Sequence, residues 1–295
     1  MPATKETVEA QNFITQFRCL ISPEVAITFV SSPSTRPYAS LALSITNCSF
    51  KMRVSLLCLL RLHPAATAIM ASSSSKEPSV KKPVLYGYAK SSCSWRVRAA
   101  FAAKNADFEC RYFNPYEATA EEKAQFALLN PLGQVPILMI DGHYLSQSVP
   151  ILEYIEETVP GPRLLPKEPG QRAQVREIVE LINSGIQPFQ NPSVAQRHSD
   201  DPNKQKEWQV YWIEKGLTAL EAVLTKTHGK CSVGDEITLA DLCLVPQLFA
   251  SRRFGANMTK FPLCVKIFDD LLELEPFRKT HPNNQADTPD ESAPI

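Results

Sequence analysis

Several common signatures of function are missing from this sequence of 295 residues. Its ten glycines form neither a G-x-G-x-x-G nor a G-x-x-x-x-G-K-[ST] pattern, which argues against a phosphate-cradling loop. Lys plus Arg and Asp plus Glu are equal at 31 each, and zero net charge argues against a nucleic-acid-binding protein. The eight cysteines contain no C-x-x-C pair, so the usual signal of a zinc ribbon or a dithiol redox site is absent.

Cysteine usage and hydropathy also indicate the cellular compartment of the protein. The cysteines are scattered through a chain too long to depend on disulfides, so reduced thiols in a cytosol-like compartment are expected. The longest apolar run near the N-terminus, residues 54–60, is shorter than the roughly 20 residues that span a bilayer, and no membrane span is expected. Apolar residues make up 44% of the chain, which is enough for packed cores, and the length fits two domains.

The first 82 residues differ in composition from the rest. They hold nine basic and four acidic residues, they are rich in Ser and Thr, and Met52 and Met70 are possible internal starts. An organelle transit segment, for a plastid or a mitochondrion, is one interpretation, and an extension that is never translated or never folds is the other. Residues 1–82 are therefore predicted to be a disordered or targeting extension.

Residues 83–160 predict a small α/β domain with the order β-α-β-α-β-β-α. Strands are expected at 83–88, 108–113 and 135–140. Asp141-Gly142 is typical of a type I′ turn that leads into a returning strand. Helices are expected at 95–104, at 118–129 and from Ser148, as the N-cap, to about Val159.

The remainder of the chain predicts helices only. A Pro- and Gly-rich linker at 161–170 leads into an all-helical domain over 171–280. One helix carries a buried face with i, i+3, i+4, i+7 spacing, formed by Val175, Ile178, Val179 and Ile182. Thr238 and Asp241 form the capping box of another helix. The polar residues 281–295 are predicted to form a mobile tail.

The turn between the first strand and the first helix concentrates polar groups. It offers three hydroxyls and a thiol, from Ser91, Ser92, Cys93 and Ser94. A helix N-terminus favours anions, and neither a nearby base nor a G-x-S-x-G elbow is present to activate a serine nucleophile. We therefore interpret the hydroxyls as hydrogen-bond donors to an anion. The alternative is that one serine does no more than cap the helix.

The segment from Tyr86 to Arg98, with its Ser-Ser-Cys-Ser-Trp-Arg-Val-Arg core, closely resembles the first turn and helix of zeta-class glutathione transferases, the maleylacetoacetate isomerases of tyrosine breakdown. The resemblance covers about residues 83–295 and continues through Asn130-Pro131, Val135-Pro136, Gln147-Ser148, Ile186-Gln187-Pro188, Val233-Gly234-Asp235-Glu236 and Asp287-Thr288-Pro289. It implies an α/β thioredoxin-like N-terminal domain plus an all-α C-terminal domain, with glutathione bound between them.

The resemblance also implies residue roles. A serine of the turn would contact the glutathione sulfur, with Ser91 favoured, Ser92 second and Cys93 close by. The bond Val135–Pro136 would be cis, and the Val135 backbone would pair with the cysteinyl part of the cofactor. The implied cofactor-binding set is Ser91, Ser92, Cys93, Ser94, Trp95, Arg96, Val135, Gln147, Ser148, Gln187, Asn191 and Ser193. In one departure, residues 114–123 lack the family's glutamine-bearing loop for the glycyl end.

The expected reaction is the glutathione-dependent isomerisation of maleylacetoacetate to fumarylacetoacetate. This substrate is a diacid, so Arg253 would clamp a carboxylate, with Arg96 as a second candidate; a surface role is the alternative for Arg253. Three other functions stay open: glutathione transfer to small α-halo acids such as dichloroacetate, a non-catalytic binding module, and a monothiol redox protein built on Cys93. The resemblance further implies a homodimer whose ligands are small molecules. Cysteine usage favours a cytoplasmic location, and no residue spacing supports a metal site.

Overall fold

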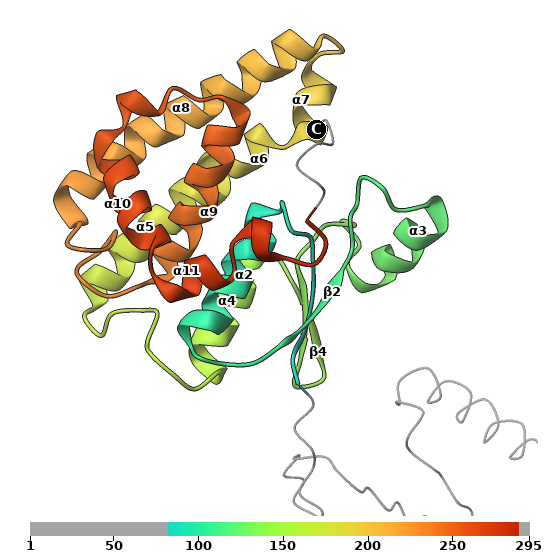
Figure 1. Cartoon of the computed structure of the whole chain (residues 1–295), viewed down its shortest axis with the longest axis horizontal. Helices are drawn as coiled ribbons and strands as arrows, with labels where there is room; N and C mark the ends of the chain where they lie inside the picture. Colours follow the sequence, from blue (N-terminus) through green and yellow to red (C-terminus); the bar gives the residue numbers. More distant parts are fainter. Residues whose placement is uncertain (1–81, 289–295) are drawn as a thin grey trace, which may run out of the picture. The chain divides into compact units, whose positions relative to one another are not determined.

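The computed structural model describes residues 82–288, so the predicted extension at 1–82 lies outside the described residues apart from Lys82. The described part combines a small sheet flanked by helices with a larger bundle of helices (Figure 1). None of the helices between residues 82 and 288 combines the length and the apolar character that a bilayer crossing needs.

The sheet has four strands in the order β2-β1-β3-β4. Their bounds are β1 Val84–Gly87, β2 Glu109–Tyr112, β3 Ile137–Ile140 and β4 His143–Ser146. Strands β1 and β2 are parallel, whereas β1–β3 and β3–β4 are antiparallel. Asp141 and Gly142, between β3 and β4, have φ values of 51° and 81°, as a type I′ turn requires, so the predicted hairpin is confirmed.

Three helices flank the sheet: α2 Ser92–Ala103, α3 Ala120–Leu129 and α4 Ser148–Thr158. Helices α2 and α4 pack together between the sheet and the helical bundle, and α3 lies on the other side of the sheet (Figure 1). Phe126 of α3 stacks on Phe113 with ring centroids 3.8 Å apart and meets the edge of Tyr86. The sheet is therefore covered on both faces by apolar side chains.

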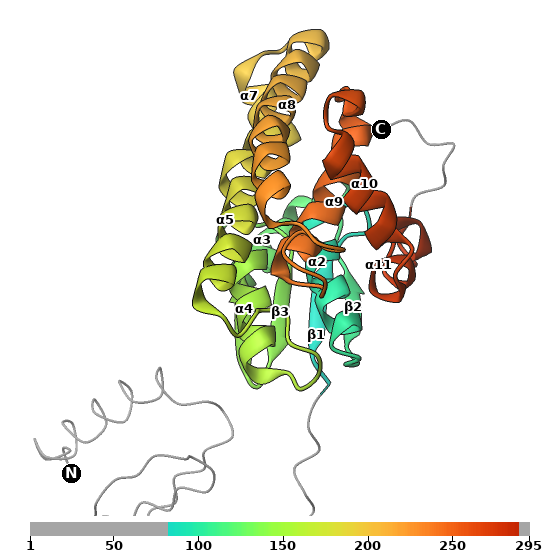
Figure 2. The same ribbon diagram turned by 90° about the vertical axis from the view of Figure 1, so that its left-hand side faces the viewer.

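The helical half follows in sequence as α5 Pro169–Gly185, α6 Gln187–Gln190, α7 Pro192–His198, α8 Pro202–Thr227, α9 Leu239–Phe254, η3 Met258–Lys260, α10 Pro262–Leu272, α11 Glu275–Lys279 and η4 Pro282–Asn284. The long helices α5 and α8 pack side by side (Figure 2). All four residues of the predicted apolar face of α5 are buried, which confirms that prediction.

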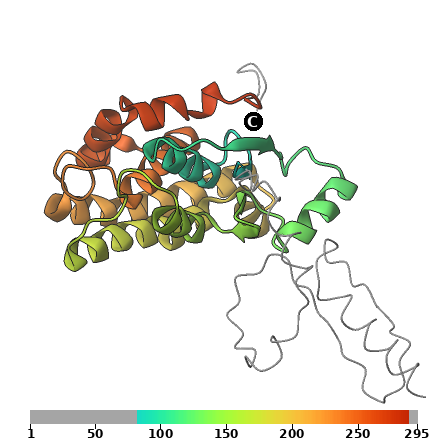
Figure 3. The same ribbon diagram turned by 90° about the horizontal axis from the view of Figure 1, so that it is seen from below.

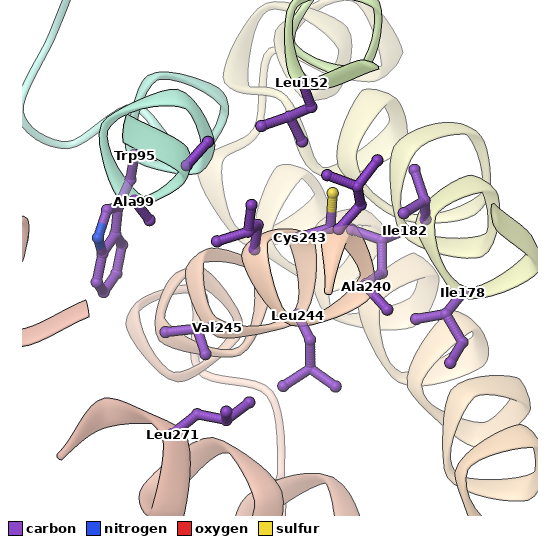
Figure 4. Close-up of a cluster of buried hydrophobic side chains, with 14 of the residues drawn as sticks. Trp95, Ala99, Leu152, Ile178, Ile182, Ala240, Cys243, Leu244, Val245 and Leu271 are labelled. Atoms are coloured by element: carbon purple, nitrogen blue, oxygen red, sulfur yellow. The ribbon is translucent and has the colours of Figure 1, made fainter. Parts of the chain in front are cut away.

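Helix α9 forms the centre of the bundle and joins it to the sheet half. Its side chains are buried along nearly its whole length, and it packs on α2, α5, α8 and α10. Figure 4 shows Trp95 and Ala99 of α2 facing Val245 of α9, with Ile182 of α5 near Cys243. The two halves therefore share one continuous hydrophobic core.

The C-terminal segment, residues 281–288, was predicted to begin a mobile tail. In the structure it makes specific contacts with both halves of the molecule. The His281 ring meets the edges of Trp95 and Phe249, with ring centroids 5.2 and 5.0 Å away. Asp287 accepts a hydrogen bond from the Ala89 amide. The described part of the segment is therefore in contact with residues far back in the chain, such as Ala89, while its mobility stays a prediction and residues 289–295 lie outside the described residues.

The predicted capping box of α9 is confirmed, and it is fully buried. The Asp241 carboxylate accepts hydrogen bonds from the amides of Thr238 at 2.7 Å and Ser232 at 2.8 Å. Burial raises the pKa of Asp241 above its usual value, even though these hydrogen bonds act in the opposite direction. Helix α3 carries the same motif at the surface, formed by Thr119 and Glu122.

Because of this difference in burial, the two boxes should differ in their effect on stability. Asp241→Ala should lower the free energy of unfolding by about 2–4 kcal/mol, because it leaves two amides buried without an acceptor. Glu122→Ala should cost about 1 kcal/mol or less, because water can replace the lost group. Urea unfolding of both variants measures the two losses; equal losses would contradict burial as the cause.

Candidate active site

The turn that leads from β1 into α2 is built around Ser91. Ser91 is the N-cap of α2, and its Oγ accepts a hydrogen bond from the Ser94 amide at 3.2 Å. The Ser91 carbonyl accepts from the Trp95 amide at 3.0 Å. Within residues 82–288, the amides of Ser92 and Cys93 have no hydrogen-bond acceptor. The first turn of the helix therefore presents two backbone donors that can hold an anion.

The side chains of the turn add to these donors. Because Ser91 Oγ accepts a hydrogen bond, its hydroxyl proton is left to donate to another group. The hydroxyl of Ser92 has no partner among the described residues, and Ser91, Ser92 and Cys93 are all half-buried. Ser91 thus does both things considered from the sequence: it caps the helix, and it can donate to an anion.

The N-terminus of α4 forms a second group of donors. Gln147 is the N-cap, with a positive φ of 70°, and its exposed side chain makes no capping hydrogen bond. The amides of Ser148 and Val149 have no acceptor within residues 82–288. The prediction that Ser148 is the N-cap is wrong, because Ser148 is the first helical residue and its Oγ accepts from Arg96 Nη1 at 3.0 Å.

Strand register brings these donors to the same end of the sheet. In the β1–β3 and β3–β4 ladders Ile137 is opposite Tyr86 on one side and Ser146 on the other. The C-terminal ends of β1 and β4 therefore lie at the same edge as the N-terminal end of β3, which Val135 precedes by two residues. The Val135–Pro136 bond is cis, as the resemblance implied. The Val135 backbone N–H and C=O have no partner among residues 82–288, so an extended ligand can pair with them.

Arg96 connects the N-termini of α2 and α4 on their buried side. Its side chain is fully buried, and Nη1 donates both to Ser148 Oγ and to Asn183 Oδ1 of α5, each at 3.0 Å. The neighbouring Trp95 is 1% exposed and donates from Nε1 to Thr280 Oγ1 at 2.9 Å. Ser94 is also fully buried, and its Oγ accepts from the Tyr88 amide.

These placements bear on the predicted site. Ser94, Trp95 and Arg96 have almost no accessible surface, so they support the turn from behind. Their predicted contacts with glutathione, and that of Arg96 with substrate, stay predictions. A side chain at Gly87 would place its Cβ 3.2 Å from that of Ser94, so glycine lets α2 approach β1 closely.

Arg253, near the C-terminal end of α9, supplies a positive charge beside two tyrosines. Burial raises the pKa of Tyr88 and of Tyr116, and the Arg253 charge acts in the opposite direction on both. The Tyr88 and Tyr116 rings meet edge to face, with centroids 6.3 Å apart. Arg253 keeps solvent contact, and within residues 82–288 no carboxylate lies within 4.0 Å of it. By contrast, the adjacent Arg252 is paired with Asp269 at 2.9 Å.

The predicted residues of the helical half lie around the junction of α5, α6 and α7. Asn191 is the N-cap of α7, and its Oδ1 accepts from both the amide and the hydroxyl of Ser193. Gln187, the first residue of α6, is half-buried, and its side-chain amide makes no hydrogen bond among the described residues. Within the described structure, Gln187, Asn191 and Ser193 form no hydrogen bond with the turn at 91–94. Their contacts with a cofactor therefore stay predictions.

Sequence reasoning missed three residues that the structure brings to this region. Asn183 follows the last residue of the predicted buried face of α5, Ile182, so helical spacing could have placed it at the edge of that face. Tyr88 and Tyr116 come next to Arg253 only through packing of the two halves. Nothing in the local sequence around Tyr116 indicates that contact.

Comparisons with known proteins agree with this geometry. The family model "Glutathione S-transferase, N-terminal domain" matches residues 83–157, and "Glutathione S-transferase, C-terminal domain" matches residues 186–275. The chain is 47% identical over 211 residues to maleylacetoacetate isomerase of Mus musculus, which covers 71% of this chain and 97% of the relative. It is 46% identical over 214 residues to probable maleylacetoacetate isomerase 1 of Drosophila melanogaster, covering 72% and 86%.

Solved structures give the same result. A maleylacetoacetate isomerase from Anaeromyxobacter dehalogenans 2CP-1, with GSH bound in its active site, has a TM-score of 0.64 and 40% identity and covers 70% of this chain and 98% of its own. A maleyl pyruvate isomerase described as a bacterial zeta-class glutathione S-transferase has a TM-score of 0.66 and 33% identity, covering 70% and 100%.

The chain belongs to the glutathione S-transferase family and, within it, to the zeta class. The relatives with which it shares most of its length carry the name maleylacetoacetate isomerase. The predicted family and the predicted fold class, a thioredoxin-like domain followed by a helical domain, are confirmed.

Proposed function

We propose that this protein is a glutathione-dependent enzyme that isomerises maleylacetoacetate to fumarylacetoacetate. The observation that carries the proposal is the first turn of α2. It combines the unpaired amides of Ser92 and Cys93 with the hydroxyls of Ser91 and Ser92. Relatives that share 46–47% identity with this chain have the name of that activity.

The described residues fit glutathione part by part. The amides of Ser148 and Val149 and the side chain of Gln147 suit the γ-glutamyl carboxylate at the N-terminus of α4. The unpaired backbone of Val135 suits the cysteinyl part, and the turn that starts at Ser91 suits the sulfur. When bound, glutathione supplies the thiolate that adds to the cis double bond beside a carbonyl, permits rotation about the resulting single bond and then leaves.

The turn provides enough stabilisation to keep that sulfur ionised. A thiol with a pKa near 8.5 needs about 2.7 kcal/mol of preferential stabilisation of its anion to reach a pKa of about 6.5. One hydroxyl that donates to a charged sulfur contributes about 1.5–3 kcal/mol, and a helix N-terminus contributes about 0.3–1 kcal/mol. Their sum, about 1.8–4 kcal/mol, brackets the required 2.7 kcal/mol, so Ser91 or Ser92 together with the α2 amides can supply it without a separate general base.

Arg253 fits the substrate. It is the cation that stands unpaired beside Tyr88 and Tyr116, and a guanidinium can bind a carboxylate through two parallel hydrogen bonds. Partial burial beside these rings lowers the pKa of Arg253, while the charges of the two phenols act in the opposite direction. The side chain still keeps solvent contact, so a carboxylate that arrives from solvent can reach it.

The same thiolate can also displace halide from a small α-halo acid such as dichloroacetate, which makes glutathione transfer the second candidate function. The ratio of kcat/KM on maleylacetoacetate and dichloroacetate decides between the two. A module that only binds partners is disfavoured by the intact donor set of the turn. A redox role for Cys93 is disfavoured because Arg96 stands where a second cysteine would be expected.

The turn can be tested by removing its side chains one at a time. Replacing the serine that donates to the sulfur by Ala, in Ser91→Ala or Ser92→Ala, should lower kcat about 10- to 100-fold. Cys93→Ala should keep most of the activity. The assay follows maleylacetoacetate isomerisation with and without glutathione, and Ser91→Asn, which keeps an N-cap oxygen but removes the hydroxyl, controls for the lost helix cap. Unchanged turnover in both alanine variants would remove the serines from the mechanism.

The adjacent arginines of α9 provide a matched pair of variants. Arg253→Ala should raise KM for maleylacetoacetate about tenfold or more, because a bidentate carboxylate partner is lost. Arg252→Ala should leave KM unchanged, because that side chain is already paired with Asp269. Steady-state kinetics on both variants makes the comparison. Equal KM values for the two would show that Arg253 does not bind the carboxylate.

We further propose a cytoplasmic homodimer. Five cysteines among the described residues are unpaired thiols, as a reducing compartment favours. Leu128 and Leu132, at the end of α3 and in the turn after it, are 86% and 66% exposed, and within the described residues no side chain covers them. Light scattering should give twice the mass of one chain. A single-chain mass at micromolar concentration would contradict the dimer.

A further inference from the structure

The peptide segment just before the turn at Ser91 is held from two directions. From α2, Arg98 donates to the carbonyls of Tyr88 at 3.3 Å and Ala89 at 3.1 Å. From the opposite end of the chain, Asp287 Oδ2 accepts the Ala89 amide at 2.9 Å. The Tyr88 carbonyl also accepts the Ser91 amide at 3.1 Å, so this segment is directly connected to the N-cap of α2.

The segment that carries Asp287 is itself anchored on the sheet half. Thr280 accepts a hydrogen bond from Trp95, and the His281 ring lies against the same indole. The amide of Ala286 donates to the Tyr112 hydroxyl of β2 at 3.4 Å. Figure 3 shows the C-terminal segment, in red, running beside α2 and β2. These contacts set the Asp287 carboxylate at the Ala89 amide.

Burial and charge make this contact hard to replace. Ala89 is fully buried and Arg98 is 1% exposed, although Tyr88, Lys90 and Asp287 are half-buried, so little water is available at the Ala89 amide to compensate for a lost acceptor. Burial lowers the pKa of Arg98 to about 10, and the charges of Cys110, Asp287 and Tyr112 act in the opposite direction. The Asp287 carboxylate thus provides both an acceptor for Ala89 and a negative charge near Arg98.

We propose that Asp287 is a positioning residue, which fixes the Tyr88–Lys90 segment and through it the donors of the turn that begins at Ser91. The proposal rests on the proposed function, in which that turn holds the glutathione thiolate. Asp287 does not touch the ligand; it acts through the Ala89 amide, two residues from the N-cap. Donors that stabilise a charge depend on accurate placement, so a small displacement of this segment weakens them.

The test compares three variants of the full chain. Asp287→Ala removes the acceptor, Asp287→Asn keeps an oxygen acceptor but removes the charge, and Asn283→Ala alters an exposed side chain of the same segment as a control. For each variant, the ultraviolet absorbance of the thiolate is titrated against pH with bound glutathione and no substrate. Steady-state kinetics then gives kcat and KM, and thermal unfolding gives Tm.

We expect Asp287→Ala to shift the thiolate titration to higher pH and to lower kcat about tenfold, with little change in KM for the substrate. Asp287→Asn should recover most of the lost activity, and Asn283→Ala should match the wild type. A titration for Asp287→Ala that coincides with that of Asn283→Ala would overturn the proposal, as would an Asp287→Asn variant no better than the alanine variant.

Two further results separate this proposal from the proposed function. If the wild-type protein forms the bound thiolate but does not isomerise maleylacetoacetate, the proposed function is refuted, and the titration still decides the role of Asp287. If the wild-type protein forms no glutathione thiolate, the proposed function and the role of Asp287 are both overturned. If Asp287→Ala does not fold, hydrogen exchange at the Ala89 amide of the wild type decides instead: protection supports the contact, and exchange at the rate of an unpaired amide refutes it.

Discussion

The buried guanidinium of Arg96 is the interaction on which the site depends. From α2 it reaches Ser148 at the start of α4 and Asn183 of α5, so a single side chain sets the relative positions of two helix N-termini and of both halves of the molecule. A buried charge is costly, and removing one of its hydrogen-bond partners adds to that cost. Among the described residues only Nη1 of Arg96 has partners, while Nε and Nη2 have none, so the contacts with Ser148 and Asn183 favour the arrangement in which the two helix N-termini meet at one end of the sheet.

The site is shared between two halves with different properties. The sheet half supplies backbone donors, which any sequence compatible with this fold would present at the ends of β1 and β3. The helical half supplies a side chain, Arg253, whose environment depends on Tyr88 and Tyr116 of the other half. This division explains how cofactor binding and substrate choice can be separated in one molecule. In the proposed function, the first depends on backbone donors together with the hydroxyls of Ser91 and Ser92, and the second depends on a few side chains at the interface.

Much of the fold could be predicted because the signals were local. The type I′ turn at Asp141, the capping box at Thr238 and the apolar face of α5 each depend on residues within one or two turns of one another. The prediction for Ser148 failed for the opposite reason. A serine at a helix start is usually the cap, but here Arg96, 52 residues away, takes its hydroxyl, and Gln147 becomes the N-cap.

By itself, the sequence determined the order of strands and helices, the family and the turn that begins at Ser91, because each of these is indicated by motifs of residues close together in the chain. Only the tertiary structure decided which polar side chains face the site. It turned Ser94, Trp95 and Arg96 inward, left Arg253 without a carboxylate partner among residues 82–288, and brought Asp287 to Ala89 from 198 residues away. The physical reason is that burial and pairing are properties of packed surfaces, and residues far apart in the chain supply opposite sides of each contact.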